Sequence, residues 1–121
     1  MRVCFDLDDT LCHGSNQVDG VTDYSNCYPN IMASSTLRTL RAKGHTVIIQ
    51  TARGMTTGSG RVGVVVKNIG LLTLQQLEDW GFEYDEIYFG KPSADLYIDD
   101  KGQNALDFWK ELLEAEETLW Q

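Results

Sequence analysis

The chain has 121 residues, of which 42% are hydrophobic and 23% are charged. This size and composition predict a globular protein with a single domain over residues 1–121 and one hydrophobic core. The net charge of −8 argues against a nucleic-acid partner, because domains that bind nucleic acid usually carry a basic surface.

The cysteines and the hydropathy pattern bear on the compartment. Cys4, Cys12 and Cys27 are odd in number and form no C-x-x-C pair, which indicates a reducing compartment rather than a disulfide framework. No apolar run approaches the roughly 20 residues that a membrane span needs. The first residues also lack the apolar stretch of a signal peptide. We therefore expect a cytoplasmic protein without a membrane partner.

The first half of the chain alternates between strand and helix patterns. Residues 2–6 are short, apolar and β-prone, and they predict a buried strand that ends in an acid. Residues 11–28 are rich in Gly, Ser, Asn and Asp, which predicts a loop. A helix is expected to begin near Pro29 and to end at Gly44, and residues 45–50 predict a second buried strand.

The second half continues the alternation after a glycine-rich stretch that shows no clear period. Thr73 and Gln76 form a capping-box pattern, which predicts the start of a short helix. Residues 86–89 and 96–98 predict a third and a fourth strand, and residues 106–113 predict a final helix. Short apolar strands that alternate with helices predict an α/β fold with a central parallel sheet covered by helices on both faces.

Polar side chains able to do chemistry follow each of the four predicted strands. They are Asp6, Asp8 and Thr10 after the first strand, Thr51 and Arg53 after the second, Lys91 after the third, and Asp99 and Asp100 after the fourth. The carboxyl ends of parallel strands meet at one edge of a sheet, where open α/β folds bind their ligands. We therefore expect these groups to form one site.

This set of side chains predicts a magnesium-dependent phosphate site. Carboxylates gathered at one edge repel each other unless a cation neutralises them, and oxygen ligands suit magnesium. Zinc is not expected, because His13 and His45 are the only histidines and the cysteines are dispersed. The metal and Lys91 would offset the charges of a carboxylate and a phosphoryl group, so that an aspartate could attack phosphorus. A second carboxyl group could protonate the leaving oxygen and then activate water.

The order of these motifs resembles that of the haloacid dehalogenase superfamily of phosphatases. The first motif, D-x-D-x-T after an apolar strand, is present as Asp6, Asp8 and Thr10. The second, a Thr that ends a hydrophobic strand, is present as Thr51, and the third, a lysine upstream of the last strand, is present as Lys91. The fourth, a pair of acids after an apolar strand, is present as Asp99 and Asp100. The resemblance implies a Rossmann-like three-layer fold, and the gaps between the motifs are too short for a separate cap domain.

The resemblance also implies a role for each residue. Asp6 would be the nucleophile and a Mg²⁺ ligand, and Asp8 would be the acid and base and would lend its carbonyl to the metal. Thr51 and Lys91 would hold the phosphoryl group, and Asp99 would bind the metal with Asp100 as a ligand or close neighbour. Thr10 and Arg53 are predicted to contact the substrate.

Three further segments are similar to short phosphatases of bacterial capsule biosynthesis. They are Thr-Ala-Arg-Gly-Met (51–55), Tyr-Asp-Glu-Ile-Tyr-Phe-Gly-Lys-Pro (84–92) and Tyr-Ile-Asp-Asp-Lys-Gly (97–102). The similarity implies a small phosphomonoester substrate, a sugar phosphate of surface-polysaccharide biosynthesis. Two alternatives stay open: a nucleotide or polynucleotide 3′-phosphatase, and a non-catalytic module that binds metal or phosphate. Because no cap domain is expected, cover for the site would come from residues 11–28, from residues 53–70 or from a second copy of the chain in a homo-oligomer.

Overall fold

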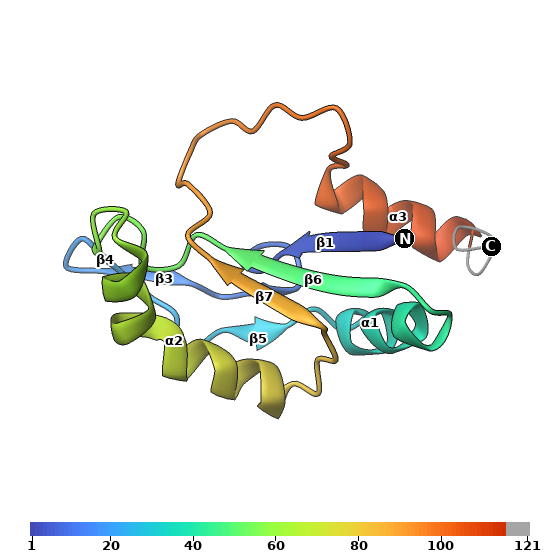
Figure 1. Cartoon of the computed structure of the whole chain (residues 1–121), viewed down its shortest axis with the longest axis horizontal. Coiled ribbons are helices and arrows are strands. Elements are labelled where there is room, and N and C mark those ends of the chain that lie inside the picture. Colours follow the sequence, from blue (N-terminus) through green and yellow to red (C-terminus); the bar gives the residue numbers. More distant parts are fainter. Residues whose placement is uncertain (116–121) are drawn as a thin grey trace.

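The computed structural model of the chain describes residues 1–115. Its central sheet contains β1 (Arg2–Asp6), β6 (Thr46–Thr51) and β7 (Glu86–Phe89), which are all parallel and lie in the order β1-β6-β7. The helices are α1 (Ala33–Ala42), α2 (Val62–Asp79) and α3 (Ala105–Ala115). In the view of Figure 1, α1 and α2 lie below the sheet and α3 lies above it, next to β1. The α/β fold with three layers and no separate cap is therefore confirmed.

The register of the sheet brings the carboxyl ends of its strands together. Asp6 at the end of β1 pairs with Gln50, and Thr51 at the end of β6 pairs with Phe89 at the end of β7. The residues that follow each strand thus begin at the same edge of the sheet. The predicted site residues at the ends of these three strands therefore begin near one another.

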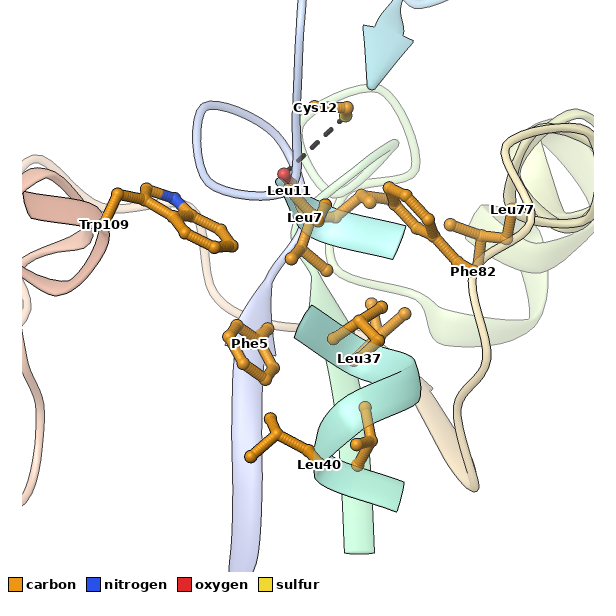
Figure 2. Packing of buried hydrophobic residues seen from close by; sticks show 12 residues of the cluster. Phe5, Leu7, Leu11, Cys12, Leu37, Leu40, Leu77, Phe82 and Trp109 are labelled. Carbon is orange, nitrogen blue, oxygen red and sulfur yellow. Dashed lines mark hydrogen bonds between the residues drawn. The ribbon is translucent and has the colours of Figure 1, made fainter. Parts of the chain in front are cut away.

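The hydrophobic core joins the sheet to all three helices (Figure 2). Phe5 and Ile49 of the sheet belong to one buried cluster with Leu37 of α1, Leu77 of α2 and Trp109 of α3. The Nε1 atom of Trp109 also donates a hydrogen bond of 3.1 Å to the carbonyl of Thr10, which fixes α3 to the turn after β1. No helix of the described part is long and apolar enough to cross a membrane.

The predicted loop over residues 11–28 contains two small antiparallel strand pairs. Strand β2 (Cys12–His13) pairs with β5 (Tyr28–Pro29), and β3 (Asn16–Val18) pairs with β4 (Val21–Asp23). Asp19 and Gly20 join β3 to β4 with φ of 52° and 78°, as a two-residue turn of the mirror-image type requires. The predicted loop is therefore partly ordered into strands, and the Asp-Gly pair between two valines is the sequence signal for this hairpin.

Helix α2 begins 11 residues before the predicted capping box at Thr73, at Val62. Gly63 and Gly70 lie inside the helix and weaken its sequence signal, since glycine is a poor helix former. The turn before the helix depends on Gly58. A Cβ atom there would lie 2.8 Å from Val65 Cγ2 and 2.9 Å from the Gly54 carbonyl oxygen. The capping-box prediction was therefore wrong, and Thr73 and Gln76 are buried in the C-terminal half of α2.

The fourth strand predicted at residues 96–98 does not form. Leu96 and Ile98 are 73% and 90% exposed, and among the described residues β1 pairs with β6 alone. The side chain of Tyr97 makes local contacts: its hydroxyl donates to the Pro92 carbonyl and accepts from the Ala94 amide. The segment that joins β7 to α3 is a long open connection, and residues 96–98 lie in it without a strand partner within residues 1–115 (Figure 1).

Candidate active site

A cavity of about 450 Å³ lies at the carboxyl edge of the sheet. Four of the predicted site residues line it: Asp6, Asp8, Arg53 and Lys91. Its rim comes from the β3–β4 hairpin, from the residues around the start of α2 and from the segment after β7. The structure thus brings together one charged cluster from segments up to 85 positions apart in the chain.

Asp6 and Lys91 form an ion pair in this cavity. Lys91 Nζ lies 3.3 Å from Asp6 Oδ1, and the two side chains are 16% and 35% exposed. The Lys91 amide donates to the carbonyl of Thr51, and its Nζ lies 4.2 Å from the centre of the Tyr97 ring. Burial raises the pKa of the Asp6 carboxyl above its ordinary value, while the charge and hydrogen bond of Lys91 act in the opposite direction.

Asp8 lies in a tight turn directly after β1. The amides of Thr10, Leu11 and Cys12 all donate to the Leu7 carbonyl, and the Asp9 amide donates to the Cys12 carbonyl. Asp9 has a φ of 63°, a left-handed conformation that aspartate tolerates better than most residues. Asp9 thus has a role in the turn, and its side chain is 82% exposed.

Arg53 is fully buried and forms a bidentate ion pair with the carboxylate of Asp8. Its Nε donates to Asp8 Oδ2 at 2.9 Å, and its Nη2 donates to Asp8 Oδ1 at 3.0 Å. Its Nη1 donates to Thr73 Oγ1 at 3.2 Å and to Gln76 Oε1 at 2.6 Å, and Nη2 also contacts Cys12 Sγ at 3.7 Å. A guanidinium has five N–H donors, so each donor of Arg53 has an acceptor inside the protein.

The prediction that Arg53 contacts the substrate is therefore not supported by its geometry. No N–H group is left for a phosphate oxygen, because the protein uses all of them. Burial by itself would lower the pKa of the Arg53 guanidinium, but the hydrogen bonds and charge of Asp8 outweigh it and the pKa is raised. Arg53 thus stays charged and interacts with Asp8. The sequence pointed to Arg53 only because it lies close to Thr51.

Two thiols complete the surroundings of Asp8. Cys12 Sγ lies 3.4 Å and Cys27 Sγ lies 3.9 Å from Asp8 Oδ1, and both cysteines are free. Burial raises the pKa of both thiols, most strongly that of Cys12. These three residues lie close enough together to hold a metal ion. However, the Arg53 guanidinium, which is itself a cation, already donates to Asp8 and contacts Cys12.

The two threonines of the predicted site lie beside the cavity rather than in its lining. Thr51 is 1% exposed, and its hydroxyl accepts a hydrogen bond of 3.0 Å from the Arg53 amide. Thr10 is half-buried, and its carbonyl accepts the hydrogen bond from Trp109. Both threonines stabilise the turns that follow β1 and β6, and their predicted contacts with phosphate stay predictions.

The two remaining acids of the predicted metal site are not brought to the cavity. Asp99 and Asp100 lie in the exposed segment after Tyr97, and Asp99 Oδ1 accepts a hydrogen bond of 2.8 Å from the Lys101 amide. Neither acid is part of the cavity lining. The physical reason is the missing fourth strand, whose carboxyl end would have placed Asp99 next to Asp6. The carboxylates that do line the cavity, Asp6, Asp8 and Asp9, do not make the predicted set of four ligands.

The cavity also has a neutral polar wall that sequence reasoning did not find. Hydroxyl and amide side chains line it from the hairpin, from the residues around the start of α2 and from the segment after Lys91: Ser15, Gln17, Thr22, Thr56, Thr57, Asn68 and Ser93. Tyr24, which follows β4, adds an aromatic ring that lies 4.6 Å from Arg53 Cζ. The Asp-Gly hairpin was the signal that could have placed part of this wall over the site.

No protein-family model and no curated protein matches the chain. Among solved structures, it is similar to the crystal structure of an MCSG target from Vibrio cholerae, with 30% sequence identity and a TM-score of 0.78. The match covers 98% of this chain and 94% of the other. The two proteins share one fold over nearly their whole lengths.

Proposed function

We propose that the protein is a phosphomonoester hydrolase that works through an aspartyl phosphate on Asp6. The observation that carries this proposal is the pairing of Asp6 with Lys91 in a cavity that also contains Asp8. A phosphoryl group that enters between Lys91 and Asp6 has a cation to offset its charge and a carboxylate in position to attack. The order of motifs along the chain supports the same chemistry.

The proposed reaction has two steps. In the first, a carboxylate oxygen of Asp6 bonds to phosphorus while the bond from phosphorus to the ester oxygen breaks, and Asp8 gives a proton to the departing oxygen. In the second, water attacks the phosphorus of the aspartyl phosphate and gives its proton to Asp8. The bond between phosphorus and Asp6 breaks, which releases phosphate and restores the carboxylate.

The hydrogen bonds of Asp8 fix the position of its carboxylate in the cavity. Both of its oxygens accept hydrogen bonds from Arg53, so the orientation of the side chain is set by the guanidinium. To donate a proton in the first step, Asp8 must first carry one. Arg53 must then give up one of its two bonds, because a protonated oxygen presents a hydrogen to the guanidinium.

The proposal includes magnesium for two reasons: the resemblance implies it, and the cavity offers oxygen donors. When bound, the ion would neutralise negative charge on the phosphoryl group. Asp6 is the predicted ligand whose carboxylate lies in the cavity without the guanidinium bonds that occupy Asp8. Since Asp99 and Asp100 lie outside the cavity, the steps above use the side chains of the chain alone.

The lining of the cavity supports a substrate with a single phosphate and a neutral, hydroxylated remainder. Lys91 and Arg53 are the basic residues of the lining, and the donors of Arg53 are already used. The neutral hydroxyl and amide groups around them suit the hydroxyls of a sugar, and they offer no cation to a second phosphate. A sugar phosphate is therefore the proposed substrate, and the resemblance to phosphatases of capsule biosynthesis implies that it belongs to surface-polysaccharide biosynthesis. The β3–β4 hairpin would supply part of the cover, and a homo-oligomer stays a prediction.

The test is a panel of phosphomonoesters assayed by phosphate release. With Mg²⁺, we expect sugar monophosphates to be hydrolysed with a higher kcat/KM than nucleoside diphosphates or an oligonucleotide 3′-phosphate. Excess EDTA should remove the activity, and added Mg²⁺ should restore it. Preference for a nucleotide would support the alternative substrate class. Binding of phosphate without turnover of any ester would support a non-catalytic module and contradict the proposal.

The pH dependence of the proposed enzyme follows from the surroundings of Asp6. Asp6 must be ionised to attack, and burial raises its pKa, so kcat/KM should fall with decreasing pH at a point above about 3.9, the ordinary pKa of aspartate. Lys91 lowers the pKa of Asp6, so Lys91→Met should move this fall to higher pH as well as reduce kcat. The two profiles are compared on one substrate, so that its own ionisation is common to both. A fall at lower pH in Lys91→Met would contradict this assignment.

A further inference from the structure

Gln76 joins two parts of the molecule that the proposed reaction needs. It is 8% exposed in the last turn of α2, and its Oε1 accepts the 2.6 Å hydrogen bond from Arg53 Nη1. Its Nε2 donates a hydrogen bond of 2.7 Å to the carbonyl of Tyr24. One amide side chain thus hydrogen-bonds both to the arginine that binds Asp8 and to the backbone directly after β4.

Tyr24 is the point at which the β3–β4 hairpin is attached to the site. It follows Asp23, the last residue of β4, and its own side chain lines the cavity. Its ring lies 4.6 Å from Arg53 Cζ, in cation–π contact with the same guanidinium. Tyr24 is therefore held through its carbonyl by Gln76 and through its ring by Arg53.

These contacts form one connected chain from the hairpin to Asp8. The hairpin contributes Gln17 and Thr22 to the cavity, so a substrate in the cavity would touch it. Any movement of the hairpin at its base changes the position of the Tyr24 carbonyl, and with it the amide of Gln76. Thr73 is the other acceptor of Arg53 Nη1, and within the described residues its side chain makes no hydrogen bond to the hairpin.

We propose that Gln76 is a positioning residue that couples the β3–β4 hairpin to Asp8 through Arg53. This inference rests on the proposed function, because it concerns the proton that Asp8 gives to the leaving group. When Arg53 gives up one bond to a protonated Asp8, its remaining bonds determine where the guanidinium lies. Gln76 accepts one of these remaining bonds. The position of its amide, and therefore of this bond, depends on the Tyr24 carbonyl to which it donates.

The test compares Gln76→Met, of similar size but without the two hydrogen bonds, with the matched control Gln75→Met. Gln75 is the exposed neighbour on the same helix, and its amide bonds to Asp79. We expect Gln76→Met to lower kcat on a sugar phosphate by roughly 10²-fold, the effect of misplacing a catalytic group by about 1 Å. On nitrophenyl phosphate, whose leaving group needs no proton, the loss should be roughly tenfold smaller. Gln75→Met should match the wild type on both substrates.

A second measurement does not depend on turnover. Amide hydrogen exchange of residues 16–24 should be faster in Gln76→Met than in the wild type, and unchanged in Gln75→Met. Gln76→Glu is the second variant, because it keeps an acceptor for Arg53 but cannot donate to Tyr24. It should also speed exchange in the hairpin.

The outcomes separate the inference from the proposed function. If the wild type hydrolyses no phosphomonoester, the proposed function fails, and with it the catalytic meaning of Gln76, whatever the exchange data show. In an active enzyme, equal losses on the two substrates would show a merely structural role and overturn the inference. Hairpin exchange that is unchanged in both Gln76 variants would also overturn it.

Discussion

Asp6→Asn is expected to lower the turnover of every phosphomonoester by roughly 10⁴-fold to 10⁶-fold, as the loss of a nucleophile does in other enzymes with covalent intermediates. The amide oxygen of asparagine is a poor nucleophile, and Asp6 is the carboxylate that Lys91 holds in the cavity. The measurement is kcat under saturating substrate and Mg²⁺. Asp107→Asn, an exposed change on α3, is the control and should leave kcat unchanged.

The stability of Asp6→Asn distinguishes loss of chemistry from loss of fold. Burial raises the pKa of Asp6 in the folded protein, so the unfolded chain ionises more easily and ionisation of Asp6 opposes folding at neutral pH. Replacement by the neutral amide removes this opposition, while Lys91 loses its partner. We expect a melting temperature close to or above that of the wild type. A folded variant with near-normal kcat would contradict the covalent mechanism.

Asp8→Asn is expected to slow hydrolysis of a sugar phosphate by roughly 10²-fold to 10⁴-fold, which is the usual contribution of general acid–base catalysis. The loss should be smaller with nitrophenyl phosphate, because its leaving group departs without a proton. The ratio of the two losses is the measurement that identifies the acid role. Equal losses on both substrates would argue that Asp8 does not protonate the leaving group.

The same change should also destabilise the protein, since Arg53 is fully buried and Asp8 is its anionic partner. Loss of one member of a buried ion pair costs about 3 kcal/mol or more, because the other charge stays in the interior. The double variant Asp8→Asn/Arg53→Met removes both charges, and it should recover part of this stability without recovering kcat. Urea denaturation of the single and double variants measures this recovery. If the double variant is less stable than Asp8→Asn, the ion pair does not explain the loss.

The buried Arg53 shows how a residue near a motif can have a different role from the one its position suggests. Sequence position places it two residues after Thr51, where an arginine could meet a substrate anion. Its acceptors come from Asp8, Thr73 and Gln76, which are 45, 20 and 23 residues away. Only the packing of α2 against the turn after β1 determines that these acceptors are present.

Local sequence patterns were sufficient to predict the α/β class, the positions of β1 and β7, and the strand ends at which Asp6, Asp8, Thr51 and Lys91 lie. These features follow from short apolar runs and from the geometry of parallel strands, which brings their carboxyl ends to one edge. Three other features could be seen only in the folded chain: the burial of Arg53, the place of Thr73 and Gln76 inside a long α2, and the exposed position of Asp99 and Asp100. Each of these depends on contacts that local patterns do not contain. A strand forms only if a neighbour pairs with it, and the direction of a long polar side chain depends on which acceptors the fold places around it.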